Sequence, residues 1–184
     1  MAFRSFPDNE AAEALFNAVR SYSIQGIDNA IRLAKEKGQT AAELLRVALP
    51  NRNQVLHVAV QDDAGKNNPD VLRKLVSLGA DVNATCGREV AISTPLHYTV
   101  GRGDVEATRI LLEAGADPLV PCINRYERTE MTCIEIATSS NIATASGRDA
   151  VLSLLKEFGA LVGSLVKIQD LVASPELNGR SGVA

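Results

Sequence analysis

Four segments of this chain share one pattern, and this repetition limits the possible folds more than any other feature of the sequence. When the chain is cut after each glycine that follows a leucine-rich run, the equivalent glycines fall at positions 38, 79, 115 and 159. The steps between them are 41, 36 and 44 residues. Periods of roughly 20–50 residues are typical of arrays in which each unit packs mainly on its neighbours. We place the units at about residues 14–38, 53–83, 93–118 and 131–162.

Each unit contains two short apolar-periodic stretches, a pattern that predicts a pair of helices. In the third unit, Leu96 and Val100 mark the first stretch, and Ile110 to Leu112 mark the second. The glycine after each second stretch suits the position just past a helix end, where the backbone adopts positive φ. One helix pair cannot bury both of its faces, so neighbouring pairs must stack to form a core.

The most regular segments resemble the ankyrin repeat family. Residues 94–97 read TPLH, residues 79–84 read GADVNA, and residues 103–105 read GDV before ILLEAGAD at 110–117. The resemblance covers residues 14–162. It implies an all-α solenoid of stacked helix-turn-helix units with long hairpin loops between repeats. For function, it implies binding to other proteins.

The chain also departs from the ankyrin pattern. The first unit lacks TPLH and the fourth reads TCIE at 132–135, so we interpret both as caps of the array. Extra residues separate the paired helices at 62–68 and 139–147. A capping box at Thr40 and Glu43 predicts a short added helix at about 41–48. We therefore expect a repeat domain over residues 1–163, then a capping helix at 164–172 and a mobile tail, which together span 164–184.

Charge and composition exclude several classes of protein. A formal net charge of −3, from 19 basic and 22 acidic side chains, gives no global attraction to nucleic acid or to a membrane surface. No apolar run of about 18 residues is present, and MAFRSFPDNEAAE does not resemble a secretory signal. Three cysteines are too few for a disulfide scaffold. We expect a cytoplasmic protein, or one secreted into a host cytosol if it is an effector.

Few residues have the chemistry of a reaction centre. His57 and His97 occupy one repeat position, where the ankyrin resemblance implies a structural cap rather than a zinc ligand. Cys86 and Cys122 also match, either as two free thiols or as a pair that can oxidise, and Cys133 suits core packing. No nucleophile elbow, HExxH or phosphate loop occurs. We therefore predict no catalytic residue, metal site, cofactor or small-molecule ligand.

Function is then expected to lie on a surface. The resemblance implies a concave face made of hairpin tips and exposed inner-helix positions. Tyrosine and arginine carry much of the energy in protein interfaces. We predict a non-catalytic module, expected to be a monomer, that acts as adaptor, inhibitor or effector. The alternative is a regulatory subunit or domain acting on an enzyme, or a bacterial or viral effector that mimics host ankyrin proteins. The predicted partner-binding residues are Gln61, Asp62, Arg88, Glu89, Arg102, Asn124, Arg125, Tyr126, Arg128 and Ser139.

Overall fold

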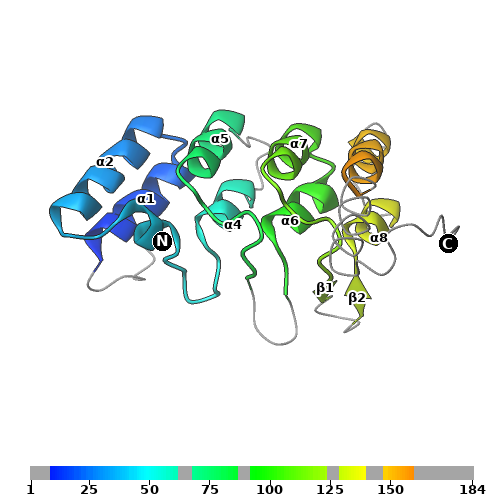
Figure 1. Ribbon diagram of the computed structural model, residues 1–184, viewed down its shortest axis with the longest axis horizontal. Coiled ribbons are helices and arrows are strands. Elements are labelled where there is room, and N and C mark those ends of the chain that lie inside the picture. Colours follow the sequence, from blue (N-terminus) through cyan, green and yellow to red (C-terminus); the bar gives the residue numbers. More distant parts are fainter. Residues whose placement is uncertain (1–8, 62–67, 87–91, 124–128, 140–146, 160–184) are drawn as a thin grey trace, which may run out of the picture.

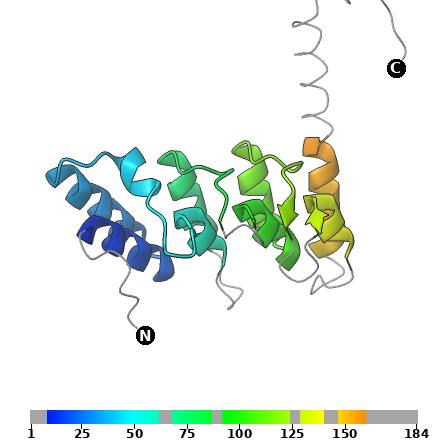
Figure 2. The ribbon, with the colours of Figure 1, turned by 90° about the horizontal axis from the view of Figure 1, so that it is seen from below.

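Helix pairs stand side by side along the chain, as the repeat pattern predicts (Figure 1). The computed structural model describes residues 9–61, 68–86, 92–123, 129–139 and 147–159. The inner helices are α1 (Glu10–Arg20), α4 (Val55–Val60), α6 (Pro95–Arg102) and α8 (Cys133–Thr138). The outer helices are α2 (Ile24–Glu36), α5 (Pro69–Ser77) and α7 (Val105–Glu113), and residues 147–159 form a further outer helix. Figure 2 shows the pairs following one another in a row.

Side-chain caps begin most of these helices. The Asn68 Oδ1 atom accepts hydrogen bonds from two backbone N–H groups of α5, and Pro69 supplies its first residue. Ser23 and Asp104 cap α2 and α7 in the same way. The helix ends follow the glycine pattern at 38, 79 and 115, where φ is +76°, +87° and +89°. The expectation was wrong for Gly159, which stays within the last helix without a positive φ.

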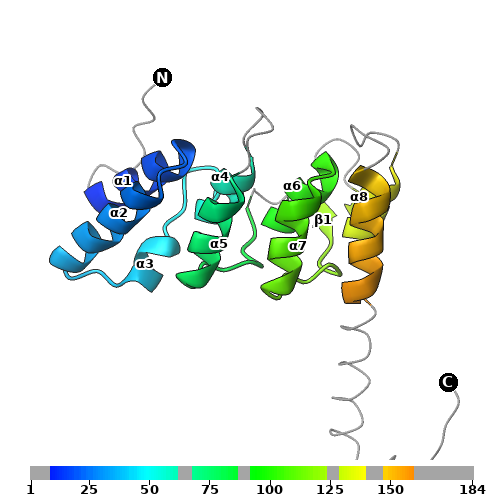
Figure 3. The same cartoon turned by 90° about the horizontal axis from the view of Figure 1, so that it is seen from above.

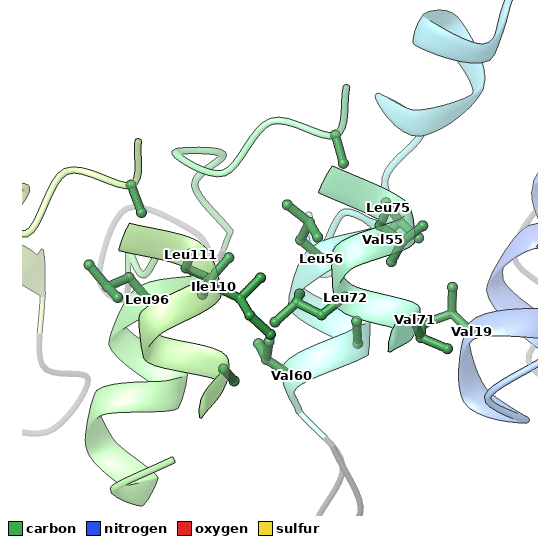
Figure 4. Packing of buried hydrophobic residues seen from close by; sticks show 14 of the residues in the cluster. Val19, Val55, Leu56, Val60, Val71, Leu72, Leu75, Leu96, Ile110 and Leu111 are labelled. Atoms are coloured by element: carbon green, nitrogen blue, oxygen red, sulfur yellow. The ribbon is translucent and has the colours of Figure 1, made fainter. Parts of the chain in front are cut away.

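The core runs continuously between the pairs. Figure 4 shows Val19 of the first pair beside Val71 of the second, and Leu72 and Val60 facing Ile110 of the third. All of these side chains are at most 5% exposed. Because each pair buries apolar surface against its neighbours, no pair has a core of its own.

The first inter-repeat connection contains the added helix α3 (Ala41–Leu45), which ends earlier than the expected residue 48. The Thr40 hydroxyl accepts from the Glu43 N–H, and the Glu43 carboxylate accepts from the Thr40 N–H at 2.8 Å. Leu44 and Leu45 are buried against α1 and α2. Figure 3 shows α3 beside α2, covering one side of the first pair.

The later connections are hairpins with short stretches of β structure, which an all-α prediction left out. Strand β1 (Cys122–Ile123) pairs antiparallel with β2 (Glu130–Met131), with Cys122 opposite Met131. An isolated bridge joins Cys86 to Ser93 in the preceding hairpin. The Ile123 N–H donates to the Ile92 carbonyl at 3.0 Å, so the two hairpins are linked by a backbone hydrogen bond. The expected capping helix and tail at 164–184 lie outside the described residues.

Candidate protein-binding surface

One long face is formed by the exposed side of the inner helices and by the bases of the connections. We call it the inner-helix face and define it by α1, α4, α6 and α8 together with residues 46–54, 81–86 and 118–123. Three sets of side chains fix its shape: histidines, an asparagine and an arginine. Each of them bonds backbone atoms of the neighbouring repeat.

The two histidines hold inner helices α4 and α6 to the hairpins that lead into the following repeats. His57 Nδ1 accepts from the Gln54 N–H at 3.2 Å, so Nε2 carries the proton and donates to the Ser93 carbonyl at 3.2 Å. His97 does the same between the Thr94 N–H, at 3.0 Å, and the Val120 carbonyl, at 3.0 Å. The structural role that the family resemblance implied for both histidines is confirmed.

Burial keeps both imidazoles neutral. Desolvation lowers the pKa of His57 to about 4, although the hydrogen bonds to backbone carbonyls act in the opposite direction. Desolvation also lowers the pKa of His97, against the smaller opposing effect of the Val120 carbonyl. The pKa of His57 lies far below neutral pH, and burial also disfavours the charged form of His97, so neither imidazole is prepared to act as a general base.

In the fourth unit, Glu135 occupies the position of the histidines. Its carboxylate accepts from the Thr132 N–H at 2.6 Å, and the Glu135 N–H donates to the Thr132 hydroxyl at 3.3 Å. These hydrogen bonds lower the pKa of the Glu135 carboxyl. The carboxylate keeps the local capping contact of the histidine, and no bond from it to another hairpin occurs among the described residues.

Asn83 joins the second and third repeats at the base of their hairpins. Its Nδ2 donates to the Gly115 carbonyl at 3.1 Å, and its Oδ1 accepts from the Asp117 N–H at 2.8 Å. One carboxamide thus satisfies a donor and an acceptor of the following turn, which fixes the spacing of the two hairpins.

Arg102 has a different setting from the one predicted for it. The sequence placed it at an exposed position of the inner helix. In the structure it is half-buried, and its guanidinium donates to the carbonyls of Val60 and Gln61 at 2.5 and 2.6 Å. These carbonyls lie at the C-terminal end of α4, where a cation is favoured. Arg102 therefore ties α6 to the preceding repeat, and its predicted contact with a partner stays untested.

A line of polar side chains crosses the inner-helix face between the second and third repeats. Asn53, only 3% exposed, donates through Nδ2 to the Gln61 Oε1 atom at 2.7 Å. The Tyr98 hydroxyl lies 3.4 Å from the Cys86 sulfur. Desolvation and the Cys86 contact raise the pKa of Tyr98 to about 12, and hydrogen bonding with Gln61 opposes this shift. At neutral pH the whole line is uncharged.

A cavity of about 520 Å³ opens between the first and second repeats. Val19, Arg20 and Tyr22 come from the end of α1 and its turn, and Val58 and Gln61 come from α4 and its C-cap. The remaining wall consists of Leu49, Pro50, Asn51 and Asn53. Of these residues the sequence singled out only Gln61. Tyr22, whose φ is positive, and the connection before α4 both line the cavity, and neither feature follows from hydrophobic periodicity.

The remaining predicted contact residues are only partly placed. Ser139 is half-buried at the end of α8, where its hydroxyl donates to the Ile136 carbonyl at 2.8 Å and its own carbonyl accepts from Arg148 at 3.2 Å. Gln61 and Arg102 are brought together, through the Gln61 carbonyl. Seven predicted residues lie outside the described part of the chain: Asp62, Arg88, Glu89, Asn124, Arg125, Tyr126 and Arg128.

The three cysteines are free and buried. Desolvation raises the pKa of Cys86 and of Cys122, and it raises the pKa of Cys133 to about 12. Thiolates are therefore scarce at neutral pH, which makes all three sulfurs poor nucleophiles. Cys133 packs in the core as expected. Within the described residues, no group of three or more His, Cys, Asp or Glu side chains could hold a metal ion, and no helix could span a membrane.

Stacked helix pairs with hairpins linked side by side define a solenoid repeat protein. A family model for ankyrin repeats, in three copies, matches residues 56–164, and the chain belongs to the ankyrin repeat family. A similar solved structure is the ankyrin repeat domain of Bcl-3, described as a unique member of the IkappaB protein family, with a TM-score of 0.53 and 24% identity. The alignment covers 77% of this chain and 50% of that one, so this chain matches half of that domain's length. Ankyrin repeats generally mediate protein–protein interactions.

Proposed function

We propose that this protein is a non-catalytic binding module that holds a partner protein on its inner-helix face and hairpin tips. The observation that carries the proposal is that side chains of adjacent repeats bond the backbone groups that shape this face. A surface fixed in advance loses little conformational entropy when a partner binds. The potentially reactive groups on the face, two imidazoles and a phenol, are neutral and serve as internal contacts.

The proposed interface includes the hairpin tip that the sequence predicts at 124–128, because of its residue types. Arg125, Tyr126 and Arg128 are residue types that contribute strongly to protein interfaces when they lose contact with water. We also propose that the protein acts as a monomer in a reducing compartment such as the cytoplasm, which is supported by its three free, buried thiols.

Affinity capture followed by titration with the purified partner tests the proposal. We expect Tyr126→Ala and Arg125→Ala each to weaken binding by about 1–3 kcal/mol while leaving the melting temperature unchanged. Arg109→Ala is the matched control, because Arg109 is exposed on outer helix α7. If all three variants bind the partner with equal affinity, the interface does not include this hairpin. A stoichiometric cofactor together with turnover of a substrate would contradict a non-catalytic role.

A further inference from the structure

We propose that residues 164–172 of this chain cover an apolar surface at the C-terminal end of the array. We call this surface the end face and define it by Ile134 of α8 and Leu152 of the helix at 147–159. These two helices form the last pair of the row (Figure 3). The sequence predicts the covering helix, and the structure supplies the surface for it. This contact within the chain goes beyond the proposed binding function and does not depend on it.

Ile134 occupies a position that is covered in the second and third units. Leu56 and Leu96, the second residues of α4 and α6, are 1% and 0% exposed. Ile134, the second residue of α8, is 37% exposed. A methyl group at Gly101, in the preceding repeat, would lie 3.7 Å from Cγ2 of Ile136. Because two residues of a helix turn by about 200°, Ile134 points away from that preceding repeat.

Leu152 shows the same difference on the outer helix. It lies seven residues before the repeat glycine, as Leu72 and Thr108 do in the second and third units. Those two residues are 3% and 0% exposed, and Figure 4 shows Leu72 facing Ile110 of the following repeat. Leu152 is half-buried. Ile134 and Leu152 thus occupy positions that a following repeat would cover, and none follows among the described residues.

The end face is narrower than the surface between two repeats. Thr138 stands where α4 and α6 carry buried valines, and Lys156 stands where α7 carries Leu112, which is 3% exposed. Both Thr138 and Lys156 are exposed. A whole repeat packed here would take the Lys156 ammonium out of water, which is costly. A single helix can cover the end face and leave Lys156 at its edge in water, so the surface suits one helix.

The segment at 164–172 has the pattern of such a helix. Its sequence, SLVKIQDLV, places Leu165, Ile168 and Val172 at i, i+3 and i+7, which share one helix face. Lys167 and Asp170 fall on the opposite face. Inner helices α4, α6 and α8 begin 16–18 residues after the preceding repeat glycine, which corresponds to positions 175–177 here. The apolar residues at 165–172 come too early for the inner helix of a further repeat.

The segment is also close enough and long enough to cover the end face. Residues 160–163, ALVG, can span up to about 13 Å, and Gly163 permits a change of direction. Nine helical residues span about 13 Å, whereas Leu152 lies seven residues, or about 10 Å of helix, before residue 159. A short covalent link gives the segment an effective concentration in the millimolar range. This advantage favours residues 164–172 over a second copy of the chain as the occupant.

Hydrogen–deuterium exchange on the full chain, at low concentration and without a partner, tests the contact. We expect residues 164–172 to exchange about tenfold or more slowly than the same sequence as a free peptide. Ile168→Asp should remove this protection and lower the melting temperature by about 3–6 °C. The matched control Lys167→Asp, on the opposite face, should change neither. Ile134→Asp should also remove protection from 164–172. Circular dichroism verifies folding, and Ile168→Asp remains informative if Ile134→Asp unfolds the chain.

Several outcomes would overturn the proposed contact. Exchange of residues 164–172 at the rate of the free peptide would do so, as would equal effects of Ile168→Asp and Lys167→Asp. Protection that appears only as the protein concentration rises, together with a dimer in sedimentation, would show that a second copy covers the end face. Protection that appears only when a captured partner protein is added would assign the end face to that partner.

Discussion

Acid should destabilise this protein well above the pH at which its carboxylates titrate. His57 has no exposed surface, and its pKa is lowered from 6.5 to about 4 in the folded state. Above pH 6.5 the imidazole is neutral in both states, so the full stability is present. Between pH 6.5 and 4 the unfolded chain binds a proton that the folded chain refuses, and the free energy of unfolding falls with pH.

The size of this effect follows from the two pKa values. Linkage with 6.5 in the unfolded state and about 4 in the folded state gives a loss of about 2 kcal/mol between pH 7 and pH 5. The pKa of His97 is lowered as well, so His97 adds a loss of the same sign. The pKa values of the Glu10, Glu43 and Glu135 carboxyls are lowered from the ordinary 4.5, so their contributions to stability are lost mainly below this window.

Urea denaturation at pH 7, 6 and 5 measures the effect, with ionic strength held constant. The matched variant is His57→Gln, which keeps an amide for hydrogen bonding but has no group that titrates here. Although the variant should be less stable at pH 7, it should lose about 2 kcal/mol less than wild type on going to pH 5. An equal loss in wild type and variant, or a wild-type stability independent of pH in this window, would refute the assignment of His57 as a buried neutral link.

Three further predictions concern other contacts. Arg102→Met should lower the free energy of unfolding by about 1–3 kcal/mol, because the carbonyls of Val60 and Gln61 lose a charged donor. Urea denaturation measures this change. An unchanged midpoint would show that these two hydrogen bonds are not formed in solution. Gly103→Ala should destabilise the fold by about 1–2 kcal/mol, because Gly103 has a φ of +68°. Gly101→Ala should stabilise it by up to about 1 kcal/mol, because Gly101 lies inside α6 with room for a methyl group. Melting temperatures that shift in the same direction for both variants would contradict this. Cys133, whose pKa is raised to about 12, should react with a thiol reagent at neutral pH only after unfolding, and fast labelling of the native protein, located by mass spectrometry, would oppose its burial.

Much of the fold could be predicted because the repeats are recognisable from short stretches of sequence. Helix pairs, the glycines at 38, 79 and 115, and the capping box at Thr40 all depend on residues close in the chain. The family resemblance supplied the role of the histidines, and the geometry of His57 and His97 confirms it. The short strands were missed because β pairing two residues long leaves no period to detect.

The surface was predicted less well, because it depends on contacts between distant residues. Arg102 looked exposed from its place in the repeat, but the carbonyls it binds lie about forty positions away in the sequence, at Val60 and Gln61. The cavity between the first two repeats is lined by Tyr22, in a backbone conformation usual for glycine, and by the connection that leads into α4. No periodic pattern encodes either feature, so the sequence could locate the inner-helix face but not its cavity.

Hydrogen–deuterium exchange on the full chain, with and without its captured partner, tests the central claim most directly. We expect the partner to slow exchange in residues 49–61 and 95–102, which belong to the inner-helix face, and to leave outer helices α5 and α7 unchanged. Protection confined to α5 and α7 would contradict the account, because it would place the partner on the opposite side of the array.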